Sequence, residues 1–139
     1  MKHLFVTYEL AVKLKDIGFH ELCFGKFLIP EIPENQFRFN TEGSPKDYNT
    51  GLYGRFISAP LYQQVADWFR EKHDLVITVY ANASGYCFEL HDSAIKGGSH
   101  RLDSDFSGPN DSGCWDKYYD SVAKAIEEAI KLTNPQVDY

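Results

Sequence analysis

The chain has 139 residues, a length typical of one domain, and its aromatic content of 15% is too high for a disordered chain. Its net charge of −6 argues against non-specific binding to nucleic acid or to an anionic membrane, since both need a basic surface. Cys23, Cys87 and Cys114 are odd in number, lie far apart and lack CxxC spacing, a pattern that fits reduced thiols better than disulfides. We therefore expect a soluble cytoplasmic protein without a membrane-spanning segment.

Helical and extended patterns alternate along the chain. Apolar residues recur at helical spacing, with start and stop signals, in three segments: 8–17, 60–73 and 116–132. Apolar, aromatic or β-branched residues predict four strands: 22–29, 35–40, 75–81 and 85–91. The order α-β-β-α-β-β-α predicts a single α+β domain over 1–139, with an antiparallel sheet of four or more strands packed by about three helices. Long loops are expected at 41–55 and 93–114.

Three stretches of the sequence carry a family resemblance. They are "FVTYELAVKLKDIGFHELCFGKF", "APLYQQVADWFREKHDLVITV" and "YYDSVAKAIEEAIKL". Together they resemble a family of small uncharacterised proteins encoded by bacteriophages and mobile elements of gut bacteria. The resemblance implies a bacterial cytoplasm and an accessory role in phage or mobile-element biology. It implies no activity, cofactor or catalytic residue.

The polar loop before the last helix raises the question of a calcium site. If the calcium-binding template starts at Asp103, Asp105 falls at its third position. Cys114 falls at the twelfth position, where the template needs a bidentate glutamate, and a strand precedes the loop instead of a helix. We interpret this loop as a connector whose Asp, Ser, Gly and Pro residues form turns. No metal or cofactor is expected.

An enzymatic alternative uses two acids and a histidine. Asp74 precedes the strand at 75–81, and Glu89 and His91 share one face of the strand at 85–91. Two carboxylates could hold Mg²⁺ and activate water in a metal-dependent phosphodiesterase or nuclease. However, His91 stands where that class of nuclease has a lysine, and the sequence offers no basic face for nucleic acid. The sequence therefore leaves the question of an enzyme open and favours a protein that is not one.

A second alternative is a small-nucleotide binder that contacts an anion through Lys96 and Arg101 in "KGGSHR". The spacing differs from that of a phosphate-binding loop, and no helix follows.

The aromatic residues of the loop at 41–55 favour a different role. Tyr48 and Tyr53 lie beside glycine and asparagine, and Arg55 follows, a composition that is common at protein interfaces. The leading hypothesis is therefore a non-enzymatic binding protein that acts through Tyr48, Tyr53 and Arg55. Its partner is an unidentified protein, with self-association as an alternative, and nucleic acid is not expected as a partner.

Overall fold

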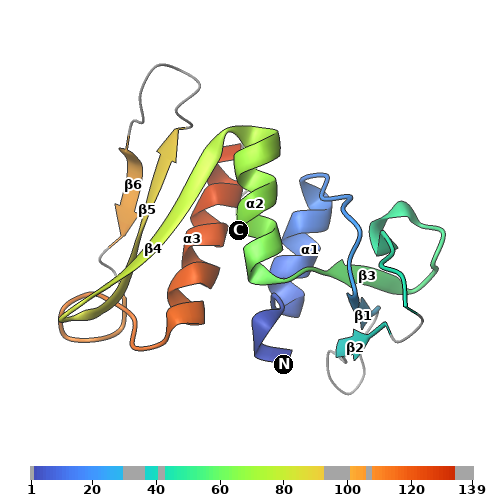
Figure 1. Cartoon of the computed structure of the whole chain (residues 1–139), viewed down its shortest axis with the longest axis horizontal. Helices are drawn as coiled ribbons and strands as arrows, with labels where there is room; N and C mark the ends of the chain where they lie inside the picture. Colours follow the sequence, from blue (N-terminus) through green and yellow to red (C-terminus); the bar gives the residue numbers. More distant parts are fainter. Residues whose placement is uncertain (1, 30–36, 41–42, 93–100, 106–107, 134–139) are drawn as a thin grey trace. The chain divides into compact units, whose positions relative to one another are not determined.

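The structure is a computed structural model that describes residues 2–29, 37–40, 43–92, 101–105 and 108–133 (Figure 1). At 92 and 101–105 it describes the backbone alone. The chain divides into two compact units, Met1–Tyr62 (unit 1) and Gln63–Tyr139 (unit 2). Compactness does not show that either unit folds alone, so a single domain over 1–139 stays a prediction.

Unit 1 consists of a helix and a three-stranded antiparallel sheet in the order β2-β1-β3. Its elements are η1 (Lys2–Leu4), α1 (Tyr8–Asp16), β1 (Gly25–Leu28), β2 (Phe37–Phe39), η2 (Tyr48–Thr50) and β3 (Phe56–Ala59). The predicted ends of the first helix are confirmed within a residue. The Thr7 side chain accepts a hydrogen bond from the Leu10 amide at 3.3 Å, and Gly18 follows the helix at a φ of 91°. α1 lies against β3.

Gly25 allows the strands of unit 1 to pack closely. Its partners in the sheet are Phe39 on β2 and Ala59 on β3. A Cβ atom at position 25 would lie 2.6 Å from the Ala59 carbonyl oxygen, 2.7 Å from the Phe37 ring and 2.9 Å from the Phe5 ring. Only glycine therefore fits under these rings without a shift of the sheet.

Unit 2 consists of a second three-stranded antiparallel sheet, in the order β4-β5-β6, and two helices. Its elements are α2 (Tyr62–His73), which begins at the last residue of unit 1, β4 (Leu75–Asn82), β5 (Gly85–Asp92), β6 (Arg101–Asp105) and α3 (Tyr118–Thr133). α3 lies against β4 and β5 and buries Val122, Ile126 and Ile130. Phe88 and Leu90 of β5 are fully buried, so the core of unit 2 forms between its sheet and α3.

The predicted α+β class and the antiparallel pairing are confirmed, but the single sheet of four or more strands is not: two sheets of three strands take its place. Two strands were not predicted: β3 lies directly before the helix expected at 60–73, and β6 lies within the loop expected at 93–114. The chain remains extended through Leu61, which pairs with Phe5, and α2 begins only after it. β6 carries polar residues and becomes a strand by pairing with β5.

The prediction that all three cysteines are reduced thiols is wrong for two of them. Cys87 and Cys114 form a disulfide, with 5.4 Å between their Cα atoms. Tyr86 and Trp115, their sequence neighbours, exchange two backbone hydrogen bonds of 2.8 and 3.0 Å, which bring the two segments together. Cys23 is buried outside the disulfide.

In the described part of the chain, no helix has both the length and the apolar character needed to cross a membrane.

Candidate functional site

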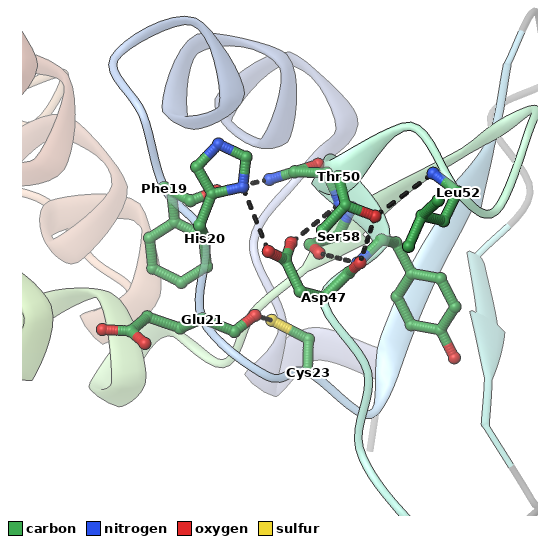
Figure 2. Close-up of polar contacts among 10 residues, drawn as sticks. Phe19, His20, Glu21, Cys23, Asp47, Thr50, Leu52 and Ser58 are labelled. Carbon is green, nitrogen blue, oxygen red and sulfur yellow. Dashed lines mark hydrogen bonds and ion pairs between the residues drawn. The ribbon is translucent and has the colours of Figure 1, made fainter.

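The candidate site is the segment between β2 and β3 in unit 1, described from residue 43 onward (Figure 2). Its beginning is fixed to the segment before β1 by a pair of backbone hydrogen bonds. The Cys23 amide donates to the Lys46 carbonyl at 2.8 Å, and the Lys46 amide donates to the Cys23 carbonyl at 3.0 Å. The loop therefore begins at a point that is paired with the segment before β1.

Asp47 organises the first turn of the loop with both of its carboxylate oxygens. One oxygen accepts a hydrogen bond from the Asn49 amide at 2.9 Å and caps η2. The other lies 3.0 Å from Nδ1 of His20, and Figure 2 shows the His20 ring directed at it. Since His20 follows α1, this contact ties the loop to the end of the helix.

Asn49 connects three segments of unit 1 through its side-chain amide. Its nitrogen donates to the Phe19 carbonyl at 2.8 Å, and its oxygen accepts from the Ser58 amide of β3 at 3.0 Å. The Ser58 hydroxyl in turn accepts from the Tyr48 amide at 3.0 Å. Asn49 and Ser58 are buried, so these bonds are shielded from water and hold the loop against the outer edge of β3.

A cluster of aromatic rings and two lysines forms the body of the loop. The Tyr48 ring lies 5.3 Å from that of Tyr53 and 6.3 Å from that of Phe56. Nζ of Lys26 lies 4.4 Å from the centre of the Phe56 ring and 5.1 Å from that of Tyr48, and Nζ of Lys46 lies 6.0 Å from that of Tyr53. These are cation–π distances, so the rings hold both ammonium groups at the base of the loop.

The tip of the loop, residues 51–55, is exposed along its whole length. Leu52 is 83% exposed and Tyr53 is 39% exposed. Gly51 and Gly54 have φ values of 87° and 61°, so the tip uses the conformational freedom of glycine at two places. The Leu52 amide donates to the Thr50 hydroxyl at 3.2 Å, which connects the tip to η2. The tip is thus an exposed segment on a fixed base.

The structure separates the three residues that were predicted to bind a partner. Tyr53 and Arg55 lie on the exposed tip, whereas Tyr48 is only 3% exposed. The Tyr48 ring therefore packs against the Tyr53 ring and offers a partner almost no surface. Sequence reasoning missed His20 and Asn49. The spacing of Asp47 and Asn49 is a local sign of a capped turn, but the partners of Asn49 are distant in the chain.

The candidates for a metal-dependent enzyme lie in unit 2 and are spread along its sheet. Glu89 and His91 contact each other, with 3.1 Å between Oε2 and Nε2. Asp74 precedes Leu75, which pairs with Asp92, whereas Glu89 pairs with Thr78. Asp74 and Glu89 are thus separated by four strand positions, or about 13 Å. The register does not place the two carboxylates around one ion, because metal–oxygen distances are only about 2–2.5 Å.

Among the described residues, no group of three His, Cys, Asp or Glu side chains could hold a metal ion. Of the two anion-binding candidates, Lys96 lies outside the described residues, and Arg101 is described only as backbone at the start of β6. Of the calcium-template residues, Asp103 and Asp105 are likewise backbone positions of β6.

The rest of the calcium-template loop is organised by Asn110. The Asn110 side-chain oxygen accepts from the amides of Ser112 and Cys114 at 3.0 and 2.9 Å. Its nitrogen donates to the Ser84 carbonyl at 2.7 Å and to the Asp116 carboxylate at 3.2 Å. These bonds join the loop to the turn between β4 and β5, which is the geometry of a connector.

No protein family model, curated protein or solved structure matches the chain.

Proposed function

We propose that the chain is a non-enzymatic binding protein that contacts another protein through the tip of the loop, residues 51–55. The observation that carries this proposal is the exposure of Leu52 and Tyr53 above a buried hydrogen-bond network. Tyr and Arg are enriched among the residues that dominate binding energy at protein interfaces. A base that is already ordered lowers the entropy that binding would cost, since less of the loop has to be fixed by the partner.

The resemblance to phage-encoded proteins supports a setting in a bacterial cell, where the protein would modulate a host or phage protein. A cytoplasmic location has a consequence for unit 2, because disulfides are rare in that compartment. A protected Cys87–Cys114 disulfide in the cell would therefore count against that location. Alkylation of the cell extract before denaturation, followed by mass spectrometry, would distinguish two labelled thiols from a protected disulfide.

An affinity pull-down from bacterial lysate tests the proposed role. The wild-type protein would be compared with the Tyr53→Ala, Arg55→Ala double variant. A matched control is Lys117→Ala, Tyr118→Ala, which also removes one exposed cation and one tyrosine, since Tyr118 is 41% exposed and Lys117 is exposed. We expect one specific partner, retained by the control variant and bound at least about tenfold more weakly by the loop variant, a loss of about 1.4 kcal/mol.

Two outcomes would contradict the proposal. If no partner is captured by the wild-type protein, the loop is not a protein-binding element under these conditions, and phosphodiesterase assays with Mg²⁺ or Mn²⁺ become the next measurement. If both double variants lose the partner equally, the contact does not lie on residues 51–55. Circular dichroism of each variant would establish that the loss does not come from unfolding.

A further inference from the structure

We infer that the loop binds an acidic segment of its partner that also carries an apolar side chain. This inference rests on the proposed function and adds the chemistry of the partner. It is carried by the positions of the lysines among the rings of unit 1, by the distribution of charge between the two units and by the exposure of Leu52.

The first observation is the group of residues Lys26, Lys46, Tyr48, Tyr53 and Phe56, which we name the cation–aromatic face. Both lysines are half-buried, and each has its ammonium group within 6.0 Å of the centre of at least one of these rings. Within the part of the chain that the structure describes, neither of them forms an ion pair with a carboxylate. The rings neutralise the ammonium charge only partly, so both lysines can still attract an anion.

One arginine extends this positive surface, because Arg55 is exposed directly before β3. Asp47, the carboxylate next to Lys46 in the chain, is already in contact with His20. Lys26, Lys46 and Arg55 therefore lie at this loop, and the neighbouring carboxylate of Asp47 is occupied by another partner.

The second observation is that the negative charge of the protein belongs to unit 2. Unit 1 has seven basic and seven acidic residues, whereas unit 2 has seven basic and thirteen acidic residues and so carries the whole net charge of −6. Unit 1 is therefore net neutral, and the lysines at its loop are not opposed by a net negative charge of their own unit. Complementary charge at a binding surface increases the rate of association and selects against partners of the same sign.

The third observation, the exposure of Leu52, favours a peptide over a nucleic acid as the ligand. Leu52 is 83% exposed and stands beside Tyr53 and Arg55 on the tip. An exposed leucine matches an apolar side chain of a peptide, while nucleic-acid binding relies on extended basic surfaces with aromatic stacking platforms. A net charge of −6 for the whole chain also repels a long polyanion more than a short acidic segment.

Fluorescence anisotropy with defined labelled peptides tests the inference. The first peptide has a leucine flanked by glutamates, and the second is identical except that glutamines replace the glutamates. A labelled oligo-dT of similar length represents single-stranded nucleic acid. We expect the glutamate peptide to bind the wild-type protein at least about tenfold more tightly than the glutamine peptide, with affinity that falls as salt is added.

Three variants place the binding on the cation–aromatic face. Lys26→Gln, Lys46→Gln should lose about tenfold in affinity for the glutamate peptide. Lys26→Arg, Lys46→Arg keeps the charge and the ring contacts, so it should retain binding. The control Lys2→Gln, Lys15→Gln makes the same change of charge at two exposed positions of unit 1 and should stay within about twofold of the wild type.

Each contrary result overturns a defined part of the inference. Equal binding of the two peptides, or no binding of either, rules out an acidic partner, and tighter binding of oligo-dT indicates a nucleic-acid surface instead. Equal losses in the Lys26/Lys46 and Lys2/Lys15 glutamine variants would mean that overall charge, not this face, attracts the peptide. The proposed function survives any of these results if the Tyr53→Ala, Arg55→Ala variant still loses the pull-down partner. If that double variant keeps the partner, the inference and the proposed function both fail.

Discussion

The two units each contain a loop that is organised by the side chain of one asparagine. In unit 1, Asn49 joins the segment after α1 to the edge of β3. In unit 2, Asn110 joins the segment before α3 to the turn between β4 and β5. In both loops the same amide group donates to one segment and accepts from another, which fixes an irregular backbone without a regular ladder.

The loops differ in the exposure of the residues that follow the asparagine. After Asn49 the chain exposes the tip at 51–55, whereas after Asn110 it buries Cys114 in a disulfide and Trp115 against the sheet. The first loop displays side chains and is held by noncovalent contacts. The second holds side chains inside and has a covalent bond in addition. The exposed loop of Asn49 and the connecting loop of Asn110 therefore differ in the burial of their side chains. They do not differ in composition, because both loops are rich in Gly, Ser, Asn and Asp.

The largest expected effect is the loss of the covalent bond in the second loop. Cys87→Ala, Cys114→Ala should lower the free energy of unfolding of unit 2 by about 3–4 kcal/mol, because the disulfide closes a loop between residues 27 positions apart. Trp68 and Trp115 are both in unit 2, so urea denaturation followed by tryptophan fluorescence reports on this unit. Reductant should lower the midpoint of the wild type and leave the variant unchanged.

Cys23→Ala is the control for this prediction, because Cys23 lies outside the disulfide. It should keep the response of the tryptophan signal to reductant. A wild-type midpoint that is insensitive to reductant would mean that the disulfide does not stabilise the second loop, which would then be held, like the first, by noncovalent contacts.

Asn49→Ala should lower the free energy of unfolding of the first loop by about 2–4 kcal/mol. The substitution leaves the Ser58 amide and the Phe19 carbonyl without their side-chain partner in a buried setting, and unsatisfied buried groups are costly. Hydrogen exchange by mass spectrometry should show faster exchange at 43–59. If the tryptophan signal of unit 2 shifts by the same amount, the two units unfold together and the two loops cannot be compared separately.

Asn110→Ala should have a smaller effect, about 1 kcal/mol, although its side chain makes four hydrogen bonds. The reason is that Asn110 is half-buried and that the disulfide still holds the loop after the substitution. The combined loss of unfolding free energy from Asn110→Ala and from reduction of the disulfide should exceed the sum of the two losses measured separately. The reason is that the Asn110 hydrogen bonds and the disulfide act on one segment. Strict additivity in urea denaturation would show that they act independently.

The smallest expected effect is a gain of about 0.5–1 kcal/mol in unit 2 from Ser121→Ala. The Ser121 hydroxyl lies on α3, is fully buried and has no hydrogen-bond partner within the described residues. Alanine removes this polar group and is a better helix former. Because the position is on α3 and not on the loop, the tryptophan-detected midpoint should rise with an unchanged response to reductant. A lower midpoint would point to a cavity left by the hydroxyl.

Local patterns predicted the helices and four of the strands, but long-range pairing determined the rest. Thr7 and Gly18 bounded α1 because capping acts within a turn or two of the chain. Pro60 stands at the expected start of the helix at 60–73, yet its carbonyl accepts from the Val6 amide at 2.9 Å, and the amide of the nearby Ser58 bonds to Asn49. Such partners cannot be read from neighbouring residues, and they keep the chain extended through β3 before α2 begins.

The candidate site was predictable to a similar extent. Tyr53 and Arg55 could be proposed from composition, and the structure places both on the exposed tip. The burial of Tyr48 and the role of Asn49 could not, because the Phe19 carbonyl that Asn49 binds lies 30 residues away. The disulfide was missed for the same reason, since the bridge between Tyr86 and Trp115 brings its cysteines together.

The disulfide also determines what a protease can release from unit 2. The 27-residue separation of Cys87 and Cys114 encloses most of β5, all of β6 and the loop before α3. A single cut between the two cysteines leaves the amino-terminal and carboxyl-terminal pieces joined, so the nicked protein migrates as one band on a gel until reductant is added. α3 would thereby stay attached to the piece of chain that carries the loop at 43–55 even after its connecting segment has been cut.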